Sequence, residues 1–112
     1  MQSNDFTRSD RLSDQIRSEI SLILRDEVRD PRLKGLTIIK VELSKDVGKA
    51  FVFFSPLNSF NDTDFRDVEE SLQKAKGFIR NLLGKRIKIK RLPELSFEED
   101  KSELILWMVS YW

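Results

Sequence analysis

The chain has 112 residues, with 20 Lys and Arg against 19 Asp and Glu. Because a chain of this length normally builds one hydrophobic core, we expect a single domain over residues 1–112. It contains no cysteine and no histidine, so it lacks a thiol nucleophile, a disulfide and the commonest zinc ligands, which excludes most acyl-transfer and metal-dependent enzymes. No apolar run approaches the roughly 20 residues of a membrane span, and we expect a soluble cytoplasmic protein without a cofactor or a membrane contact.

The first predicted element is an amphipathic helix. Its apolar residues recur at spacings of three and four between Leu12 and Val28, which places them on one helical face. Pro31 ends the helix because the residue before a proline is pushed out of the helical region. We therefore expect a helix of about 20 residues, roughly 30 Å long, followed by a turn.

Two strands are expected next, at 36–43 and 50–55. The first has an alternating tail in which Ile39, Val41 and Leu43 share one face, and the second is a short run rich in Phe and Val. Between them, Asp46 and Gly48 supply the turn chemistry of an antiparallel hairpin.

Three phenylalanines in the second strand raise the question of RNA contact, because aromatic residues on a sheet can stack bases. We interpret them as packing residues instead. Phe54 shares its face with Ala50 and Val52, which suits a face covered by helices. Phe51 and Phe53 can pack against their hairpin neighbours.

Helical spacing returns after residue 64 and is interrupted by Gly77, which costs about 1 kcal/mol in a helix interior. One long helix and two helices that break at Gly77 are both possible, and we favour two. A third strand is expected from Ile87 to Phe97, at a sheet edge or with a bulge, because Pro93 interrupts its hydrogen bonding. The resulting order is α-β-β-α-α-β, an α+β domain.

The interval 74–91 carries the strongest local charge, with eight bases and no acid. A block of this sign suits a polyanion such as nucleic acid. A solvated face that is balanced by acidic segments elsewhere is an equally weighted alternative. The eight bases are Lys74, Lys76, Arg80, Lys85, Arg86, Lys88, Lys90 and Arg91.

An anion site is predicted at the start of the last helix. A helix that begins near Lys76 or Gly77 presents unpaired N–H groups and the positive end of its dipole, and Gly77 lets a phosphate approach closely. On the third strand, Lys88 and Lys90 would point to one side and extend this surface. The alternatives are close packing of two helices at Gly77 and a solvated strand edge at the two lysines.

Four segments, in their order and spacing, resemble bacterial ribosome-binding factor A. They are Asp30–Leu33, Val41–Asp46, Ala75–Arg80 and Arg91–Phe97, and the similarity extends over about residues 8–100. The resemblance implies a single type II KH-like domain, α-β-β-α-α-β, with helices packed on one face of a three-stranded sheet. It also implies a ribosome biogenesis factor that binds the free 30S subunit and its 16S rRNA and assists late rRNA processing, notably in the cold, without catalysis.

Partners and contact residues follow from the same resemblance. The 30S subunit and 16S rRNA are the main partners, other assembly factors including GTPases are further ones, and the protein is expected to be a monomer. Ala75, Lys76 and Gly77 stand where a KH domain in general carries a GxxG loop, the shorter form known in this family. The residues expected to bind RNA are Lys74, Ala75, Lys76, Gly77, Arg80, Lys85, Arg86, Lys88, Lys90 and Arg91.

Two other functions stay open at this point. One is a KH module for other RNAs. The other is a protein-interaction module whose apolar segment Leu104–Trp112, unlike the polar tail expected of the family, docks a partner or makes a dimer. An enzyme is disfavoured, because histidine and cysteine are missing and neighbouring acids such as Glu69 and Glu70 point apart on a helix.

Overall fold

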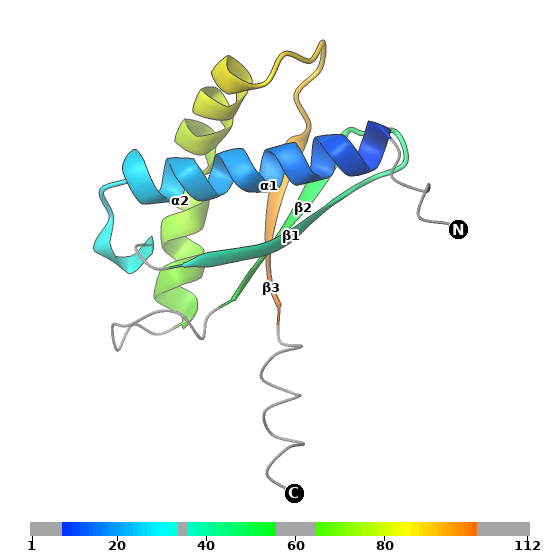
Figure 1. The fold of residues 1–112 in the computed structure, drawn as a ribbon. Coiled ribbons are helices and arrows are strands. Elements are labelled where there is room, and N and C mark those ends of the chain that lie inside the picture. Colours follow the sequence, from blue (N-terminus) through cyan, green and yellow to red (C-terminus); the bar gives the residue numbers. More distant parts are fainter. Residues whose placement is uncertain (1–7, 34–35, 56–64, 101–112) are drawn as a thin grey trace, which may run out of the picture.

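The computed structural model describes residues 8–33, 36–55 and 65–100 (Figure 1). The elements in chain order are α1 (Arg8–Asp26), the short 3₁₀ helix η2 (Pro31–Leu33), β1 (Thr37–Leu43), β2 (Lys49–Ser55), α2 (Phe65–Arg86) and β3 (Glu94–Glu99). The predicted α+β class with a three-stranded sheet is confirmed. The apolar segment Leu104–Trp112 lies outside the described residues.

Helix α1 forms where the apolar spacing predicts it, because that spacing aligns its apolar side chains along one face. Ile16, Ile20, Ile23 and Leu24 are all buried on that face. The helix ends at Asp26, somewhat before the proline that the sequence analysis takes as its stop. The apolar face continues past the helix end, because Val28 is still only 6% exposed.

The turn after α1 is held by an aspartate–arginine pair. The Asp30 carboxylate accepts hydrogen bonds from the Arg32 backbone N–H at 3.0 Å and from its guanidinium Nε and terminal nitrogen at 3.1 and 3.0 Å. The guanidinium hydrogen bonds are the main cause that lowers the pKa of Asp30 from 3.8 to about 2. This turn places the buried Leu33 in the core just before β1 begins.

Acid should weaken the fold partly through this turn. A carboxyl group whose pKa is lower in the folded state stabilises the fold above its unfolded pKa, and that contribution is lost as the pH falls through the folded value. For Asp30 the loss runs from about 3.8 down to about 2. We expect Asp30→Asn to flatten this part of the stability curve, as measured by urea unfolding at a series of pH values. If the free energy of unfolding falls equally with pH in the variant and in the wild type, Asp30 does not contribute to the loss of stability in acid.

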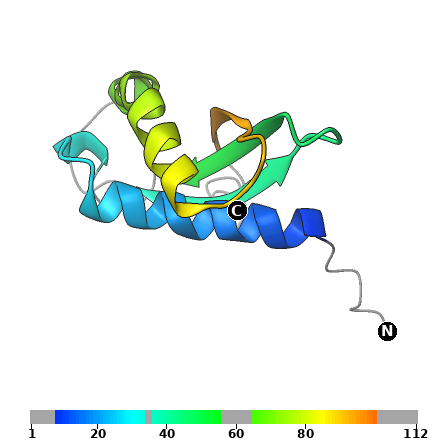
Figure 2. The same ribbon diagram turned by 90° about the horizontal axis from the view of Figure 1, so that it is seen from above.

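Strand β2 is the centre of the sheet, with β1 antiparallel on one side and β3 parallel on the other. The buried side chains of all three strands join those of both helices in one core, so the helices cover a single face of the sheet. The two helices cross each other over that face (Figures 1 and 2). This arrangement confirms the predicted antiparallel hairpin and the predicted one-sided packing.

Strand β1 contains a bulge that changes which residues face the core. The register shifts between Ile38 and Lys40, so Ile39 has no partner opposite it on β2. Ile38 and Val41 are buried, whereas Ile39 is 38% exposed. The prediction that Ile39 shares the core face with Val41 is therefore wrong, because the extra residue of the bulge shifts the alternation by one position.

The hairpin turn is built by short polar side chains. The Ser44 hydroxyl donates to Asp46 Oδ1 at 2.8 Å, and the same carboxylate oxygen accepts the Gly48 N–H at 3.0 Å. Val47 has a φ of 57°, a left-handed conformation that is rare for a β-branched residue. The Asp46 and Gly48 turn chemistry named from the sequence is confirmed.

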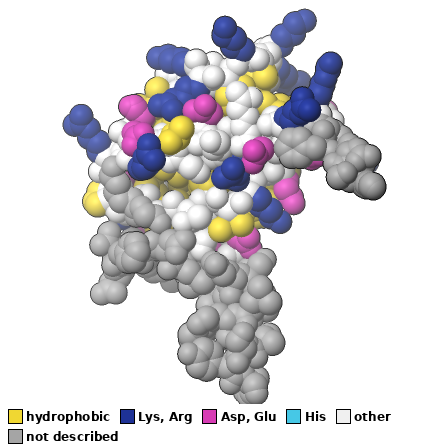
Figure 3. Space-filling model, in the orientation of Figure 1, with side chains coloured by type: hydrophobic (Ala, Val, Ile, Leu, Met, Phe, Trp, Pro, Cys, Tyr) yellow, Lys and Arg dark blue, Asp and Glu magenta, His cyan; other side chains and the backbone are white. Residues whose placement is uncertain are grey.

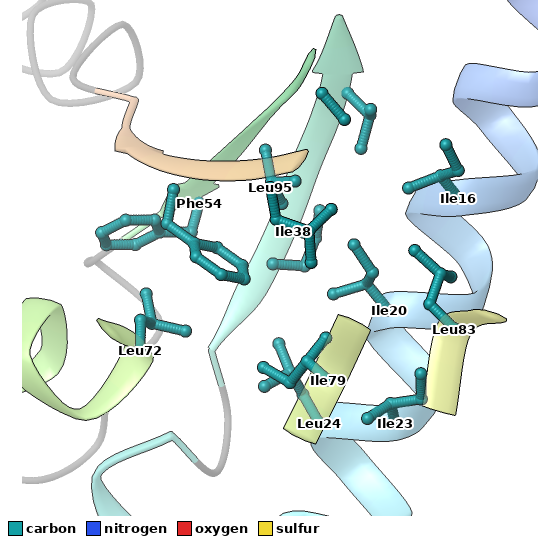
Figure 4. Close-up of a cluster of buried hydrophobic side chains, with 14 of the residues drawn as sticks. Ile16, Ile20, Ile23, Leu24, Ile38, Phe54, Leu72, Ile79, Leu83 and Leu95 are labelled. Carbon is teal, nitrogen blue, oxygen red and sulfur yellow. The ribbon is translucent and has the colours of Figure 1, made fainter. Parts of the chain in front are cut away.

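The core fills the space between the helices and the sheet (Figure 4). Phe54 on β2 and Leu95 on β3 lie opposite the isoleucines of α1, and α2 contributes Leu72 and Leu83. Phe54 is completely buried, which confirms its interpretation as a packing residue. The core has the following members: Ile16, Ile20, Ile23, Leu24, Val28, Leu33, Ile38, Val41, Ala50, Val52, Phe54, Val68, Leu72, Ile79, Leu83, Ile87, Leu95 and Phe97.

The prediction of two helices that break at Gly77 is wrong, because α2 runs unbroken from Phe65 to Arg86. Leu72 and Ile79 lie seven residues apart, or about two helical turns, so they share one buried face across Gly77. Burial of such a side chain is worth roughly 1.5–3 kcal/mol, more than the cost of about 1 kcal/mol for one helical glycine. The observed order is therefore α-β-β-α-β, with one long helix in place of two.

The third strand begins later than predicted, at Glu94 instead of Ile87. Pro93 has no N–H to donate to a neighbouring strand, and pairing with β2 starts one residue later. Residues 87–93 form a loop, so Lys88 and Lys90 do not lie on a strand. Buried and exposed side chains still alternate along this segment, because Ile87 is buried and both lysines are exposed.

Candidate nucleic-acid interface

The basic interval occupies the second half of α2 and the loop 87–93. Figure 3 shows Lys and Arg side chains projecting from the upper end of the molecule, where Figure 1 places the end of α2 and this loop. Among the predicted RNA-binding residues, only Ala75 and Lys76 are half-buried. The exposed ones are Lys74, Gly77, Arg80, Lys85, Arg86, Lys88, Lys90 and Arg91.

Two of these bases have partners within the protein. Arg80 donates from Nε to the Pro93 carbonyl at 3.2 Å and from a terminal nitrogen to the Leu92 carbonyl at 2.8 Å. Arg86 pairs with Glu19 on α1 at 3.2 Å. Arg80, one of the residues expected to bind RNA, thus has a role within the protein, because its guanidinium ties the end of the loop to α2.

Replacing Arg80 with alanine should therefore destabilise the protein. The variant leaves two carbonyls of the loop without their charged donor, and such hydrogen bonds are worth about 1 to 2 kcal/mol when they are partly exposed. Urea unfolding measures the loss. Lys85→Ala is the matched control, because Lys85 is exposed and such surface changes usually cost within about 0.5 kcal/mol. Equal stability of the two variants would show that Arg80 does not hold the loop.

Gly77 has neither of its two predicted roles, at an anion-binding helix end or at a close contact between two helices. It lies inside the continuous helix α2, so its N–H belongs to the helical ladder and the predicted helix-end anion site is absent. A Cβ built on Gly77 has no neighbour within 4 Å, so the glycine is not required for close helix packing either. Gly77 is an exposed helical position that carries a stability cost with no packing reason for it.

Gly77→Ala should consequently stabilise the fold by about 0.5–1 kcal/mol and raise the melting temperature by about 3–6 °C. The gain arises because alanine loses less backbone entropy in a helix and meets open space here. At Gly84 the added Cβ would lie 3.3 Å from Leu92 Cδ2, so Gly84→Ala should gain less. A lower melting temperature for Gly77→Ala, recorded by circular dichroism, would contradict the open environment.

The loop 87–93 presents its bases from an anchored backbone. At its start, the Ile87 N–H donates to the Leu83 carbonyl at 2.9 Å, and the Ile87 side chain is 3% exposed. At its end, Pro93 is fully buried and Arg80 binds its carbonyl. Three exposed bases lie between these anchors, and they form no ion pair with any part of the chain that the structure describes: Lys88, Lys90 and Arg91.

The hairpin turn lies beside this loop and adds charge that the sequence analysis missed. The Glu94 N–H donates to the Gly48 carbonyl at 3.0 Å, which brings the turn to the start of β3. The pKa of Asp46 is lowered mainly by the Ser44 hydroxyl, and Arg91 contributes a weaker electrostatic effect. Lys45 on the turn and Lys49 at the start of β2 are exposed. The sequence holds no signal for their place beside the loop, because it depends on the pairing of β2 with β3.

Phe78 is a further exposed residue that the sequence pattern did not indicate. Its spacing assigns it to the apolar set of α2, but its side chain is 49% exposed. The buried positions Leu72, Ile79 and Leu83 define the core face, and Phe78 points away from it together with Lys74, four residues earlier. A helical wheel drawn for one continuous helix would have revealed this exposure.

The remaining phenylalanines of β2 behave as packing residues. Phe51 and Phe53 are half-buried on the face of the sheet away from the helices. The Lys40 ammonium lies 4.9 Å from the ring centre of Phe53, its neighbour across the hairpin. Lys49 lies 5.7 Å from the ring centre of Phe51. The contact of Phe53 with Lys40 is the predicted packing against a hairpin neighbour, whereas Phe51 contacts Lys49 of its own strand.

The charge is polarised along the molecule. Helix α2 begins with Asp67, Glu69 and Glu70 and ends with Lys85 and Arg86. Strand β3 runs back from the loop and ends with two further acids, Glu98 and Glu99. The end formed by the loop 87–93 is therefore basic, and the end where α2 starts and β3 finishes is acidic.

In residues 8–33, 36–55 and 65–100 no three acidic side chains gather closely enough to hold a metal ion. Within the same ranges neither helix is long and apolar enough to cross a membrane.

Comparison with known proteins gives a single family. The profile of the ribosome-binding factor A family matches residues 8–104. A relative from Dechloromonas aromatica, named ribosome-binding factor A, is 43% identical over 102 residues, which cover 91% of this chain and 80% of the relative.

Solved structures agree with the sequence comparison. The solution structure of a Thermotoga maritima protein described as a ribosome-binding factor A superposes with a TM-score of 0.74 and 34% identity, covering 90% of this chain and 94% of that one. A homology model of the Thermus thermophilus factor, fitted into an electron microscopy map of a 30S complex with that factor, superposes with a TM-score of 0.59 and 26% identity, covering 84% of this chain and 92% of that one. The predicted resemblance is thus confirmed, and the chain belongs to the ribosome-binding factor A family.

Proposed function

We propose that this protein binds the free 30S subunit through its 16S rRNA, assists late processing of that RNA without catalysis, and leaves when maturation is complete. The observation that carries the proposal is the group of exposed bases on the loop 87–93, which form no ion pair with the described residues and stand on an anchored backbone. The T. thermophilus factor, which is similar to this chain, was fitted into a 30S complex.

The chemistry of this surface suits rRNA. Lysine and arginine side chains neutralise phosphates and release condensed counterions, which supplies affinity without reading the base sequence. A loop that is held in place at both ends loses little conformational entropy on binding. Lys88, Lys90 and Arg91 are the central contacts in this proposal, Lys74, Lys76 and Lys85 extend the surface along α2, and Arg80 positions the loop.

Several further properties belong to the same proposal. They are a cytoplasmic location, a role that matters most in the cold, a monomeric state, and contact with other assembly factors, GTPases among them. The absence of histidine and cysteine from the sequence supports a binding role over an enzymatic one.

Co-sedimentation tests the central claim. The purified protein is mixed with free small subunits, with complete ribosomes, or with a short single-stranded RNA. We expect it to pellet with free small subunits and to remain in the supernatant with complete ribosomes. Equal binding to both particles would refute an assembly role, and equally tight binding of the short RNA would favour a general KH module.

A further inference from the structure

Phe78 is an exposed aromatic side chain in the middle of α2. Phe78 is 49% exposed, more than Ile39 at 38%. A single exposed apolar residue is ordinary in a soluble protein and indicates nothing alone. Its surroundings are the reason to assign it a role.

The exposed neighbours of Phe78 on α2 are polar or basic. Ala75 and Leu82, three residues before and four residues after Phe78, are half-buried against the core, whereas Lys74, Asn81 and Lys85 are exposed. Residues four and seven apart share one helical face, which brings Lys74 and Lys85 into line with Phe78. Along the helix axis they lie about 6 Å and 10 Å from it, within reach of long side chains.

We propose that Phe78 stacks on an unpaired base of the bound rRNA, while Lys74 and Lys85 hold phosphates of the same strand on either side. This inference rests on the proposed function and deepens it, because it names the ligand at this face as a single-stranded nucleotide with its base turned out.

The composition of the face favours a nucleotide over a protein partner. An aromatic ring offers a flat surface that stacks on any base, and flanking ammonium groups neutralise the adjoining phosphates. A protein-docking patch would need further apolar residues around its central anchor. The apolar residues beside Phe78, Ala75 and Leu82, are half-buried against the core, and its exposed neighbours are Lys74, Asn81 and Lys85.

The test compares two substitutions of Phe78 in the full chain, with purified free small subunits as the probe. Phe78→Leu keeps an apolar side chain but removes the aromatic face, and it should weaken binding about 5- to 100-fold. Phe78→Tyr keeps the face and should bind within about twofold of the wild type. Ile39→Ala, which truncates an exposed apolar residue on β1, is the matched control and should bind normally.

Salt dependence separates stacking from charge. Stacking releases no counterions, so Phe78→Leu should keep the wild-type slope of log affinity against log salt. Because the ring is half exposed, the melting temperature of each variant should stay within about 3 °C of the wild type. A variant that melts far below this range would show that the ring is packed, and would overturn the inference.

Other results overturn the inference in distinguishable ways. Wild-type affinity for Phe78→Leu means that an apolar contact, or none, suffices at this position. If the salt slope of Phe78→Leu is shallower than that of the wild type, Phe78 only positions the lysines. In both cases the wild-type protein still binds the free small subunit, so the proposed function survives; failure of the wild type to bind refutes the proposed function itself.

Discussion

Replacing Lys88 and Lys90 together with alanine should weaken binding to the free small subunit about 25- to 60-fold at about 0.1 M salt. Each lost phosphate contact reduces the slope of log affinity against log salt by roughly 0.7 to 0.9. Two contacts therefore remove about 1.4 to 1.8 units, and the affinity difference follows if both proteins bind equally near 1 M salt. Titrations at several salt concentrations measure both quantities.

Stability should hardly change in the Lys88 and Lys90 variant, because both side chains are exposed and the loop is anchored by Ile87, Pro93 and Arg80 instead. Arg29→Ala is a suitable control, since it removes an exposed positive charge outside the interval 74–91. A salt slope for the double variant equal to that of the wild type would refute the electrostatic role of the loop.

Phe54→Ala should cause the largest loss of stability, about 3–5 kcal/mol. Phe54 is completely buried on the central strand, opposite Ile38 in the hairpin, and Figure 4 shows it among side chains of the sheet and of α2. A chain of this length has a total stability of roughly 6–15 kcal/mol, so the variant would lose a large part of it.

Urea unfolding of Phe54→Ala and Phe53→Ala makes the comparison quantitative. Phe53 is adjacent in sequence but half-buried on the opposite face, where it contacts Lys40. Its truncation leaves no enclosed cavity, so the loss should be clearly smaller, about 1 kcal/mol. Similar losses for both variants would mean that the two faces of the sheet are equally buried.

Local patterns in the sequence predict a helix or a turn correctly where the decisive interaction involves residues close together in the chain. The spacing from Leu12 to Val28 and the turn residues Asp46 and Gly48 lead directly to α1 and the hairpin, because apolar periodicity and turn chemistry are local properties. The break predicted at Gly77 fails for a different reason. A helix propensity describes one residue, whereas burial of Leu72 and Ile79 on one face is decided by the whole core.

Only part of the candidate site can be predicted from the sequence, because the charge of a side chain does not show which group in the protein it contacts. Lys88 and Arg80 are equivalent when bases are counted, yet Lys88 is exposed on the loop and Arg80 binds two backbone carbonyls. The contribution of Lys45 needs the contact between Gly48 and Glu94, which joins segments far apart in the chain. Such pairings appear only when the topology is known.

The opposed charges at the two ends of the molecule have a kinetic consequence. A body that is basic at the loop 87–93 and acidic near Asp67 and Glu99 has an electric dipole moment along α2 and β3. In the negative field of a polyanion this dipole experiences a torque that turns the basic end forward before contact. Encounters then begin in a productive orientation, which shortens the rotational search that limits most associations of macromolecules. A net charge of only +1 conceals this steering, which depends on the separation of the charges and weakens as salt screens them.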